Sequence, residues 1–116
     1  MILREWRAEV RREKLDEYVA YVRETGLAQY AATPGNLGAA IATRHLDAAR
    51  SEIVTHSYWR SLEDIVAFAG EPIDRARYFP MDDQYLLTRP GTVAHFELLA
   101  ERLPSVGQEQ PLNRNA

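Results

Sequence analysis

His95 is the residue of this chain with the clearest potential for acid–base chemistry. The alternation of residue types around it predicts a strand that places Val93 and Glu97 on the same face. A carboxylate beside an imidazole raises the imidazole pKa and favours proton exchange near neutral pH. Glu5 and Arg7 on an earlier strand allow a second interpretation, in which a ladder of ion pairs uses the same residues without any reaction.

Other polar residues offer weaker indications of chemistry. The adjacent acids Asp82 and Asp83 are typical of a turn, and neighbouring residues rarely converge on one metal ion. Ser57, His95 and Asp83 contain the residue types of a nucleophilic triad, but no strained serine turn surrounds Ser57. His56 is interpreted as a surface or interface residue. No glycine-rich loop leads into a helix with a lysine, so no nucleotide cofactor is indicated.

Composition narrows the class of protein. The chain has 116 residues with 14 basic and 17 acidic side chains, a net charge of -3 and no cysteine. This length fits one domain, and the mixed charges give no broad basic surface for nucleic acid. Without cysteine, disulfides and thiolate metal sites are excluded. Met1 leads into a charged stretch, and no apolar run is long enough for a signal or a membrane span, which predicts a cytoplasmic protein.

Four segments alternate between apolar and polar residues, as strands do when one face is buried. The third segment places Ile53, Thr55, Ser57 and Trp59 on one face. In the first, the apolar side carries Ile2, Trp6, Ala8 and Val10. The expected strands are residues 2–10, 37–47, 51–60 and 92–99.

Helical periodicity occurs in two places between these strands. Residues 12–30 carry apolar side chains at intervals of three and four, and the turn Thr33-Pro34-Gly35-Asn36 ends this helix. Ser61 with Asp64 three residues later predicts the start of a second helix, which Gly70 ends. Pro72 is expected to begin another short helical turn, and residues 81–88 an irregular one.

The order strand, helix, strand, strand, helix, strand predicts an α+β protein. With right-handed crossovers it folds most simply into a ferredoxin-like four-stranded antiparallel sheet with helices on one face. Residues 1–103 form this domain, and residues 104–116 are expected to be a polar, mobile tail. The uncovered sheet face is expected to carry tryptophan or isoleucine residues, which predicts a homodimer packed sheet to sheet.

Over about residues 2–99 the chain resembles the antibiotic biosynthesis monooxygenase-like family of dimeric α+β barrel proteins. The resemblance is carried by the order of elements and by three stretches of sequence. These are the TPGN turn at 33–36, YWRSLEDIVAFAGEPIDRARYFPMDDQYLL at 58–87 and VAHFELL at 93–99. The wider superfamily has many activities, so the resemblance implies the fold more strongly than the chemistry.

A monooxygenase of this type, as the resemblance implies, uses no cofactor. It deprotonates a phenolic substrate in an apolar cavity between sheet and helices, and the resulting carbanion reacts with oxygen directly. Trp59 matches the family's tryptophan at a strand end, where its indole would line the cavity or, alternatively, anchor the corner as a core aromatic. Tyr78 lies in a segment that resembles the family's lid. The predicted catalytic residues are therefore His95, Tyr78 and Trp59.

The chain departs from the heme-degrading branch of the superfamily. That branch uses an asparagine on the first strand and a histidine after the second helix, whereas this first strand has no asparagine and Tyr78 lies near the histidine position. Heme is therefore not an expected cofactor.

Two functional hypotheses follow. The first is a cofactor-independent monooxygenase acting on a small hydrophobic or aromatic substrate. The second is a non-catalytic homodimer that binds a small ligand or has a structural role. They differ in one observable: the first predicts that His95 or Tyr78 faces an apolar cavity that touches Trp59. The second predicts that these groups are tightly packed or hydrogen-bonded to the protein.

Overall fold

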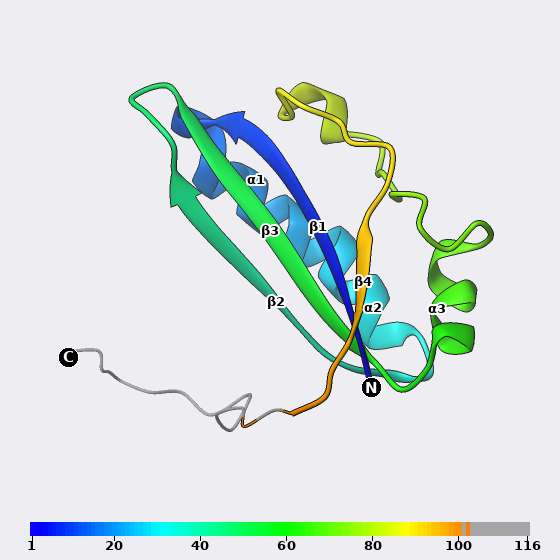
Figure 1. Cartoon of the computed structure of the whole chain (residues 1–116). Coiled ribbons are helices and arrows are strands. Elements are labelled where there is room, and N and C mark those ends of the chain that lie inside the picture. Colours follow the sequence, from blue (N-terminus) through cyan, green and yellow to red (C-terminus); the bar gives the residue numbers. More distant parts are fainter. Residues whose placement is uncertain (101, 103–116) are drawn as a thin grey trace.

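The computed structural model describes residues 1–100 and 102, which form a four-stranded antiparallel sheet with helices packed on one face (Figure 1). In spatial order β2-β3-β1-β4, the strands are β1 (Ile2–Arg11), β2 (Asn36–His45), β3 (Arg50–Trp59) and β4 (Ala94–Glu97). This arrangement confirms the predicted ferredoxin-like α+β fold. The predicted tail at 104–116 lies outside the described residues.

The edge strand β4 is shorter than the alternation of residues 92–99 predicts. It pairs with β1 only from Glu97 opposite Ile2 to Ala94 opposite Glu5. The two preceding residues bond elsewhere, because Thr92 bridges to Arg75 and the Val93 amide donates to the Asp74 carbonyl at 2.8 Å.

The first helical region extends from residue 12 to residue 32 and confirms the predicted helix. It consists of η1 (Arg12–Lys14), α1 (Leu15–Val22), η2 (Arg23–Leu27) and α2 (Ala28–Ala32), of which η2 is a wider π-helical turn. This region packs across the sheet, while α3 (Leu62–Ala69) lies beyond the end of β3 (Figure 1).

Both ends of α3 follow the local signals of the sequence. Ser61 Oγ accepts a hydrogen bond from the Asp64 amide at 3.3 Å, and Gly70 ends the helix with a φ of 74°. The helical turn expected after Pro72 is limited to a single hydrogen-bonded turn, in which the Arg75 amide donates to the Pro72 carbonyl at 3.1 Å. The chain after this turn is extended and irregular, and the Ala76 amide donates to the Gly91 carbonyl at 2.9 Å instead of continuing a helix. A single turn, η3 (Asp82–Gln84), occurs within the irregular stretch predicted at 81–88.

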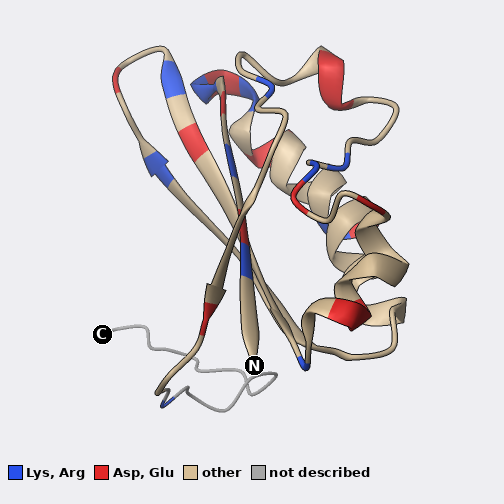
Figure 2. Ribbon diagram, turned by 45° about the vertical axis from the view of Figure 1, so that its right-hand side comes forward, with Lys and Arg blue, Asp and Glu red and all other residues tan. Residues whose placement is uncertain are grey.

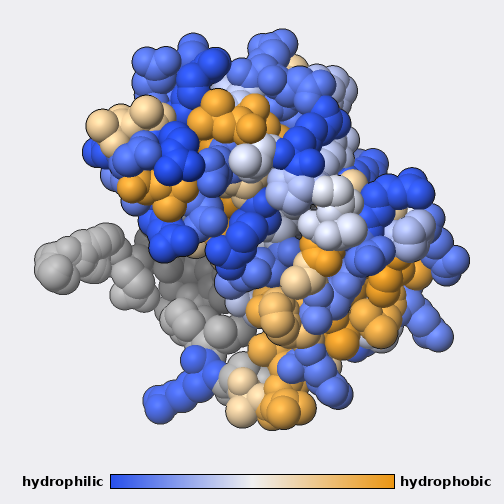
Figure 3. All heavy atoms as spheres, turned by 45° about the horizontal axis from the view of Figure 1, so that its top comes forward, coloured by the Kyte–Doolittle hydropathy of each residue, from blue (hydrophilic) through white to orange (hydrophobic). Residues whose placement is uncertain are grey.

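The covered face of the sheet supplies the core, and the period of two along β1 and β3 decides which residues reach it. The tryptophans point to this side, so the expectation that tryptophan or isoleucine lines the uncovered face is wrong. Figure 2 shows acidic and basic residues interleaved along the strands, and Figure 3 shows separate hydrophobic patches among hydrophilic residues. The buried residues of the two strands are Arg4, Ala8, Val10, Ser51, Ile53, Thr55, Ser57 and Trp59.

The contact between the turn before β2 and the start of α3 can be tested by substitution at Gly35. Gly35 has a φ of 93°, and a Cβ there would overlap the side chain of Asp64 at the start of α3. We expect Gly35→Ala to lower the free energy of unfolding by about 2 to 4 kcal/mol, through backbone strain and overpacking. Gly91→Ala is the matched control, because a Cβ at Gly91 meets nothing within 4 Å. Urea unfolding measures both, and equal losses in the two variants would contradict this account.

Candidate functional site

A small cavity lies between the covered face of the sheet, the helical region 12–32, α3 and the segment that connects α3 to β4. Its volume is about 40 Å³. The connecting segment runs from α3 to η3 and returns beside β1 as β4 (Figure 1). Apolar and aromatic side chains form much of the wall, namely Trp6, Val22, Phe68, Phe79 and Val93. An apolar wall with a few polar groups is the usual composition of a ligand site.

Arg4 on β1 contributes a buried cation to this wall. Arg4 is only 2% exposed, and it lines the cavity. One terminal nitrogen donates to the Ile73 carbonyl at 2.6 Å and lies 3.0 Å from His95 Nε2, and the other donates to the Arg75 carbonyl at 3.0 Å. Burial lowers the pKa of Arg4, but an arginine remains charged at any physiological pH. The site therefore carries a positive charge inside the fold.

A second guanidinium comes from Arg77 in the connecting segment. Its Cζ lies 5.2 Å from the ring centroid of Phe68 and 5.5 Å from that of Phe79, while the Cζ of Arg4 lies 5.6 Å from Phe68. Arg77 also donates to the Phe68 carbonyl at 2.6 Å. Two cations thus share one aromatic ring at the cavity, an arrangement stabilised by the negative face of the ring.

On the helix side, Tyr18 and Asp82 form a buried pair on the cavity wall. The Tyr18 hydroxyl donates to Asp82 Oδ1 at 2.8 Å, and Asp82 Oδ2 accepts from the Phe79 amide at 2.6 Å. Burial and the nearby Asp82 carboxylate raise the pKa of Tyr18, so its hydroxyl stays a donor. Tyr30 Oη and Thr55 Oγ1, 3.4 Å apart, add two further hydroxyl groups.

Trp59 is fully buried but is not among the residues that line this cavity. Its indole Nε1 donates to Ser57 Oγ at 2.8 Å, and its ring packs against Tyr30 and Phe68. The structure therefore agrees with the interpretation of Trp59 as a core aromatic that anchors the corner. It does not support the form of the monooxygenase hypothesis that placed Trp59 in the cavity wall.

Tyr78 lies behind the cavity wall. Its hydroxyl donates to the Pro90 carbonyl at 2.6 Å and accepts from Trp6 Nε1 at 3.3 Å. Burial raises its pKa. Because the hydroxyl already has a donor and an acceptor within the protein, Tyr78 positions Trp6, and it is Trp6 that reaches the cavity.

His95 faces the covered side of the sheet, opposite Arg4 in register. Its pKa is lowered by burial and by the Arg4 charge, so the expectation that Glu97 raises it is wrong. Glu97 is exposed and pairs in register with Ile2. The structure thus brings His95 to Arg4, while it leaves His95, Tyr78 and Trp59 without direct hydrogen bonds to one another.

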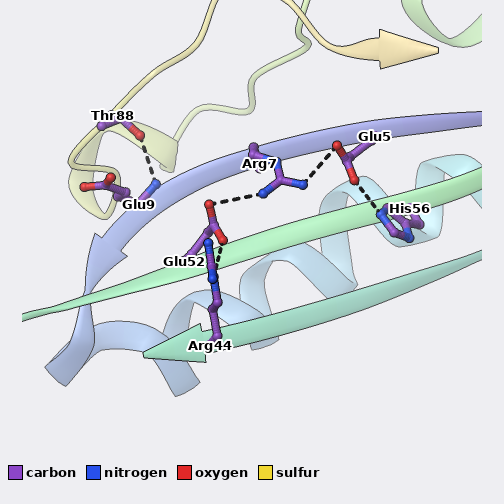
Figure 4. Close-up of polar contacts among 7 residues, drawn as sticks. All are labelled: Glu5, Arg7, Glu9, Arg44, Glu52, His56 and Thr88. Carbon is purple, nitrogen blue, oxygen red and sulfur yellow. Dashed lines mark hydrogen bonds and ion pairs between the residues drawn. The ribbon is translucent and has the colours of Figure 1, made fainter. Parts of the chain in front are cut away.

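The ion-pair ladder exists on the open face of the sheet, and of its predicted members it contains Glu5 and Arg7. Arg7 lies 3.0 Å from Glu5 and 3.4 Å from Glu52, and Arg44 lies 2.7 Å from Glu52 (Figure 4). His56 Nε2 lies 2.8 Å from Glu5 Oε2, and this contact lowers the pKa of Glu5. His95 and Glu97 do not take part in it.

Arg4 was not among the site residues predicted from the sequence, although its position in the alternating pattern of β1 is unusual. Arg4 stands between Ile2 and Trp6 on the side of β1 that reads as apolar. A charged residue on a buried face needs a partner, and this marks it as functional or as a structural connector. Arg77 had no comparable signal, because it lies in an irregular segment.

No family model matches the chain, and no curated protein matches it. A solved structure from Nitrosomonas europaea, provisionally assigned as an antibiotic biosynthesis monooxygenase, is similar with a TM-score of 0.60. The alignment covers 86% of this chain and 100% of that one at 16% identity. The likeness lies in the fold. At this identity it says nothing about which residues of the cavity act on a substrate.

Residues 1–100 and 102 contain no group of three or more histidines and acidic residues arranged to hold a metal ion. Within the same part of the chain, no helix is long and apolar enough to cross a membrane.

The environment of His95 predicts a pH-dependent stability. Because its pKa is lower in the folded protein than the unfolded value of about 6.5, the unfolded state binds the extra proton first. The resulting decrease in the free energy of unfolding is absent above about pH 6.5 and grows as the pH falls below that value. We expect His95→Gln to lose less stability than the wild type between about pH 7.5 and about pH 5.

Urea unfolding at both pH values measures this difference. His45→Gln is the control, since His45 lies exposed near the end of β2. Wild type and His95→Gln losing the same stability on acidification would contradict the assignment to His95.

Proposed function

We propose that the protein is a cofactor-independent monooxygenase that binds a small hydrophobic or aromatic substrate in the cavity beside Arg4. The observation that carries this proposal is the cavity itself, which lies between sheet and helices and combines aromatic walls with a few buried polar groups. The fold shared with a provisionally assigned monooxygenase adds support by analogy.

The proposed reaction balances with molecular oxygen alone. A substrate CH₂ group loses a proton to give a carbanion, which reduces O₂ and forms a C–O bond to it, and the resulting peroxide anion takes up a proton in place of the one that was lost. Loss of water from the peroxide leaves a C=O group, so one oxygen atom enters the product and the other leaves as water. Such a reaction requires that the anion be stabilised, and the buried cation of Arg4 on the cavity wall supports this requirement.

The volume of the cavity limits this proposal. At about 40 Å³ it is far smaller than the roughly 300 Å³ or more of a site for a drug-sized ligand. A polycyclic substrate therefore requires that residues 71–93 move away from the helices. Side-chain bonds hold this segment, including those from Arg77 to the Phe68 carbonyl and from Tyr18 to Asp82.

The non-catalytic hypothesis has its own supporting observation. His95, Tyr78 and Trp59 are each hydrogen-bonded within the protein, and none lines the cavity. The observable that separates the two hypotheses therefore supports the non-catalytic one, and it argues against a monooxygenase that uses these three residues. In this alternative the cavity binds a small ligand without converting it. Turnover, rather than binding, distinguishes the two.

Gly26 offers a test that leaves every polar group in place. It lines the cavity within the π-helical turn η2, and a Cβ there would make ordinary contacts, 3.8 Å from Val22 and 4.0 Å from Phe79. We expect Gly26→Leu to fill the cavity and to reduce oxygen uptake with anthrones and hydroquinones by about tenfold or more. The matched control, Gly26→Ala, should retain most of the activity.

Oxygen consumption and quinone absorbance are followed without added metal. If the wild type consumes no oxygen above the protein-free rate with any of these substrates, the monooxygenase proposal is wrong. Equal uptake by wild type and by a folded Gly26→Leu variant would place the reaction outside this cavity.

We also propose that two copies pack through their open sheet faces. Leu3, Tyr58 and Phe96 are neighbours in register on this face, and Phe96 is 48% exposed. Beside them, the ladder of Figure 4 carries both signs of charge, so a two-fold axis can bring Arg7 or Arg44 of one copy near Glu5 or Glu52 of the other. These apolar and charged groups support a self-complementary interface.

The pair Phe96→Asp and Leu62→Asp tests this interface. The wild-type side chains are similarly exposed, 48% for Phe96 and 46% for Leu62, but Leu62 lies on α3, away from the open face. We expect Phe96→Asp to halve the mass measured by light scattering and Leu62→Asp to leave it unchanged, because only the first buries a charge. A monomeric wild type at micromolar concentration would contradict the homodimer.

A further inference from the structure

We propose that the cavity is a binding site for a small planar oxyanion, a carboxylate or an enolate, held by the guanidinium of Arg4 with Arg77 beside it. The inference rests on the proposed function to the extent that it names the ionised group that the substrate presents in the cavity. Binding of such an anion is measurable without turnover, so the two proposals are tested separately.

Arg4 lacks a carboxylate partner in the described part of the chain. Within residues 1–100 and 102, no carboxylate lies within ion-pair distance of its guanidinium. Its hydrogen-bond partners are the carbonyls of Ile73 and Arg75, the ring of His95 and the hydroxyl of Tyr30, none of them a carboxylate. Burial lowers the pKa of Arg4 most strongly, Tyr30 raises it, and Asp74 raises it least. A buried cation is normally paired, and here a bound anion supplies the pair.

The donors of Arg4 and Arg77 suit an anion. A guanidinium has five N–H groups in a planar fork, and the contacts of Arg4 to Ile73, Arg75 and His95 use three of them in the described part of the chain. A hydrogen bond with Tyr30, which raises the pKa of Arg4, uses a fourth. One N–H of Arg4 remains for a ligand, and Arg77 on the same wall supplies further donors. A planar oxyanion with two oxygens matches this geometry better than a neutral amide, since it accepts charge-assisted hydrogen bonds at both atoms.

The balance of charge around the cavity also favours an anion. Arg4 and Arg77 contribute two positive charges, and Asp82 contributes one negative charge on the same wall. The two oxygens of Asp82 already accept hydrogen bonds from Tyr18 and the Phe79 amide. The three charged side chains on the cavity wall therefore sum to one positive charge, and an incoming anion neutralises it.

The size of the cavity selects a compact group. About 40 Å³ accommodates roughly three water-sized groups, each needing about 10 to 15 Å³ on the same measure. A carboxylate or enolate fragment has three heavy atoms of this size. The remainder of a larger substrate would extend past Phe79 toward the connecting segment, whereas the charged fragment stays at Arg4.

The indole N–H signals of the two tryptophans give a direct readout in ¹H–¹⁵N spectra. Trp6 lines the cavity and Trp59 does not, so Trp59 serves as an internal control. At constant ionic strength, we expect acetate to shift the Trp6 signal in a saturable manner and acetamide, its neutral analogue, to leave it unchanged. Arg77→Gln should weaken acetate binding roughly tenfold, as loss of a charged contact does.

Arg60→Gln is the matched charge control, because its side chain is 68% exposed and lies outside the cavity. Arg4→Lys tests whether the planar guanidinium is required, since lysine keeps the charge but cannot bind two oxygens side by side. If Arg4→Lys unfolds, Arg77→Gln still tests the site, because it leaves every Arg4 hydrogen bond intact. Equal shifts with acetate and acetamide, or equal affinities in Arg77→Gln and Arg60→Gln, would overturn the proposal.

Oxygen uptake separates this proposal from the monooxygenase proposal. Acetate binding at Trp6 without oxygen uptake by any substrate would retain the oxyanion site and contradict the monooxygenase. Oxygen uptake that neither responds to acetate nor depends on Arg77 would retain the monooxygenase and overturn the oxyanion site.

Discussion

The bonds made by Arg4 connect the parts of the fold that surround the cavity. From the middle of the covered sheet face, its guanidinium reaches the carbonyls of Ile73 and Arg75 and the ring of His95. It therefore ties β1 to the connecting segment and to the edge strand. Because the Ile73 and Arg75 carbonyls point at Arg4, they are not free to accept hydrogen bonds along a helix axis, and the turn that begins at Pro72 does not continue as a helix.

The same strand separates two kinds of electrostatics. Arg4 and Glu5 are adjacent in sequence, yet a strand sends successive side chains to opposite faces. Glu5 joins the ladder on the open face, where partial exposure to water makes each ion pair weak. Arg4 lies on the covered face, where burial makes its charge costly and its partners decisive. A shift of one residue in register would exchange these roles.

Much of the fold was predictable because its signals are local. The alternation of the strands, the Ser61 cap and the positive φ at Gly70 each depend on residues close together in the sequence. The site was not predictable in this way, because its contacts join distant residues. Arg4 and His95 are 91 positions apart, and periodicity gives each one a face but not a partner. For that reason His95 was expected beside Glu97, which register places opposite Ile2.

The helical side of the cavity shows how a local irregularity creates space. The helix widens at η2, and Gly26 within it presents no side chain to the interior. A regular helix with a larger residue there would place atoms where the cavity now lies, near Val22 and Phe79. π-helical turns are rare and occur often at functional sites. The sheet therefore contributes the charge through Arg4, and the helix contributes the volume through Gly26. A ligand that occupies this volume must contact both residues.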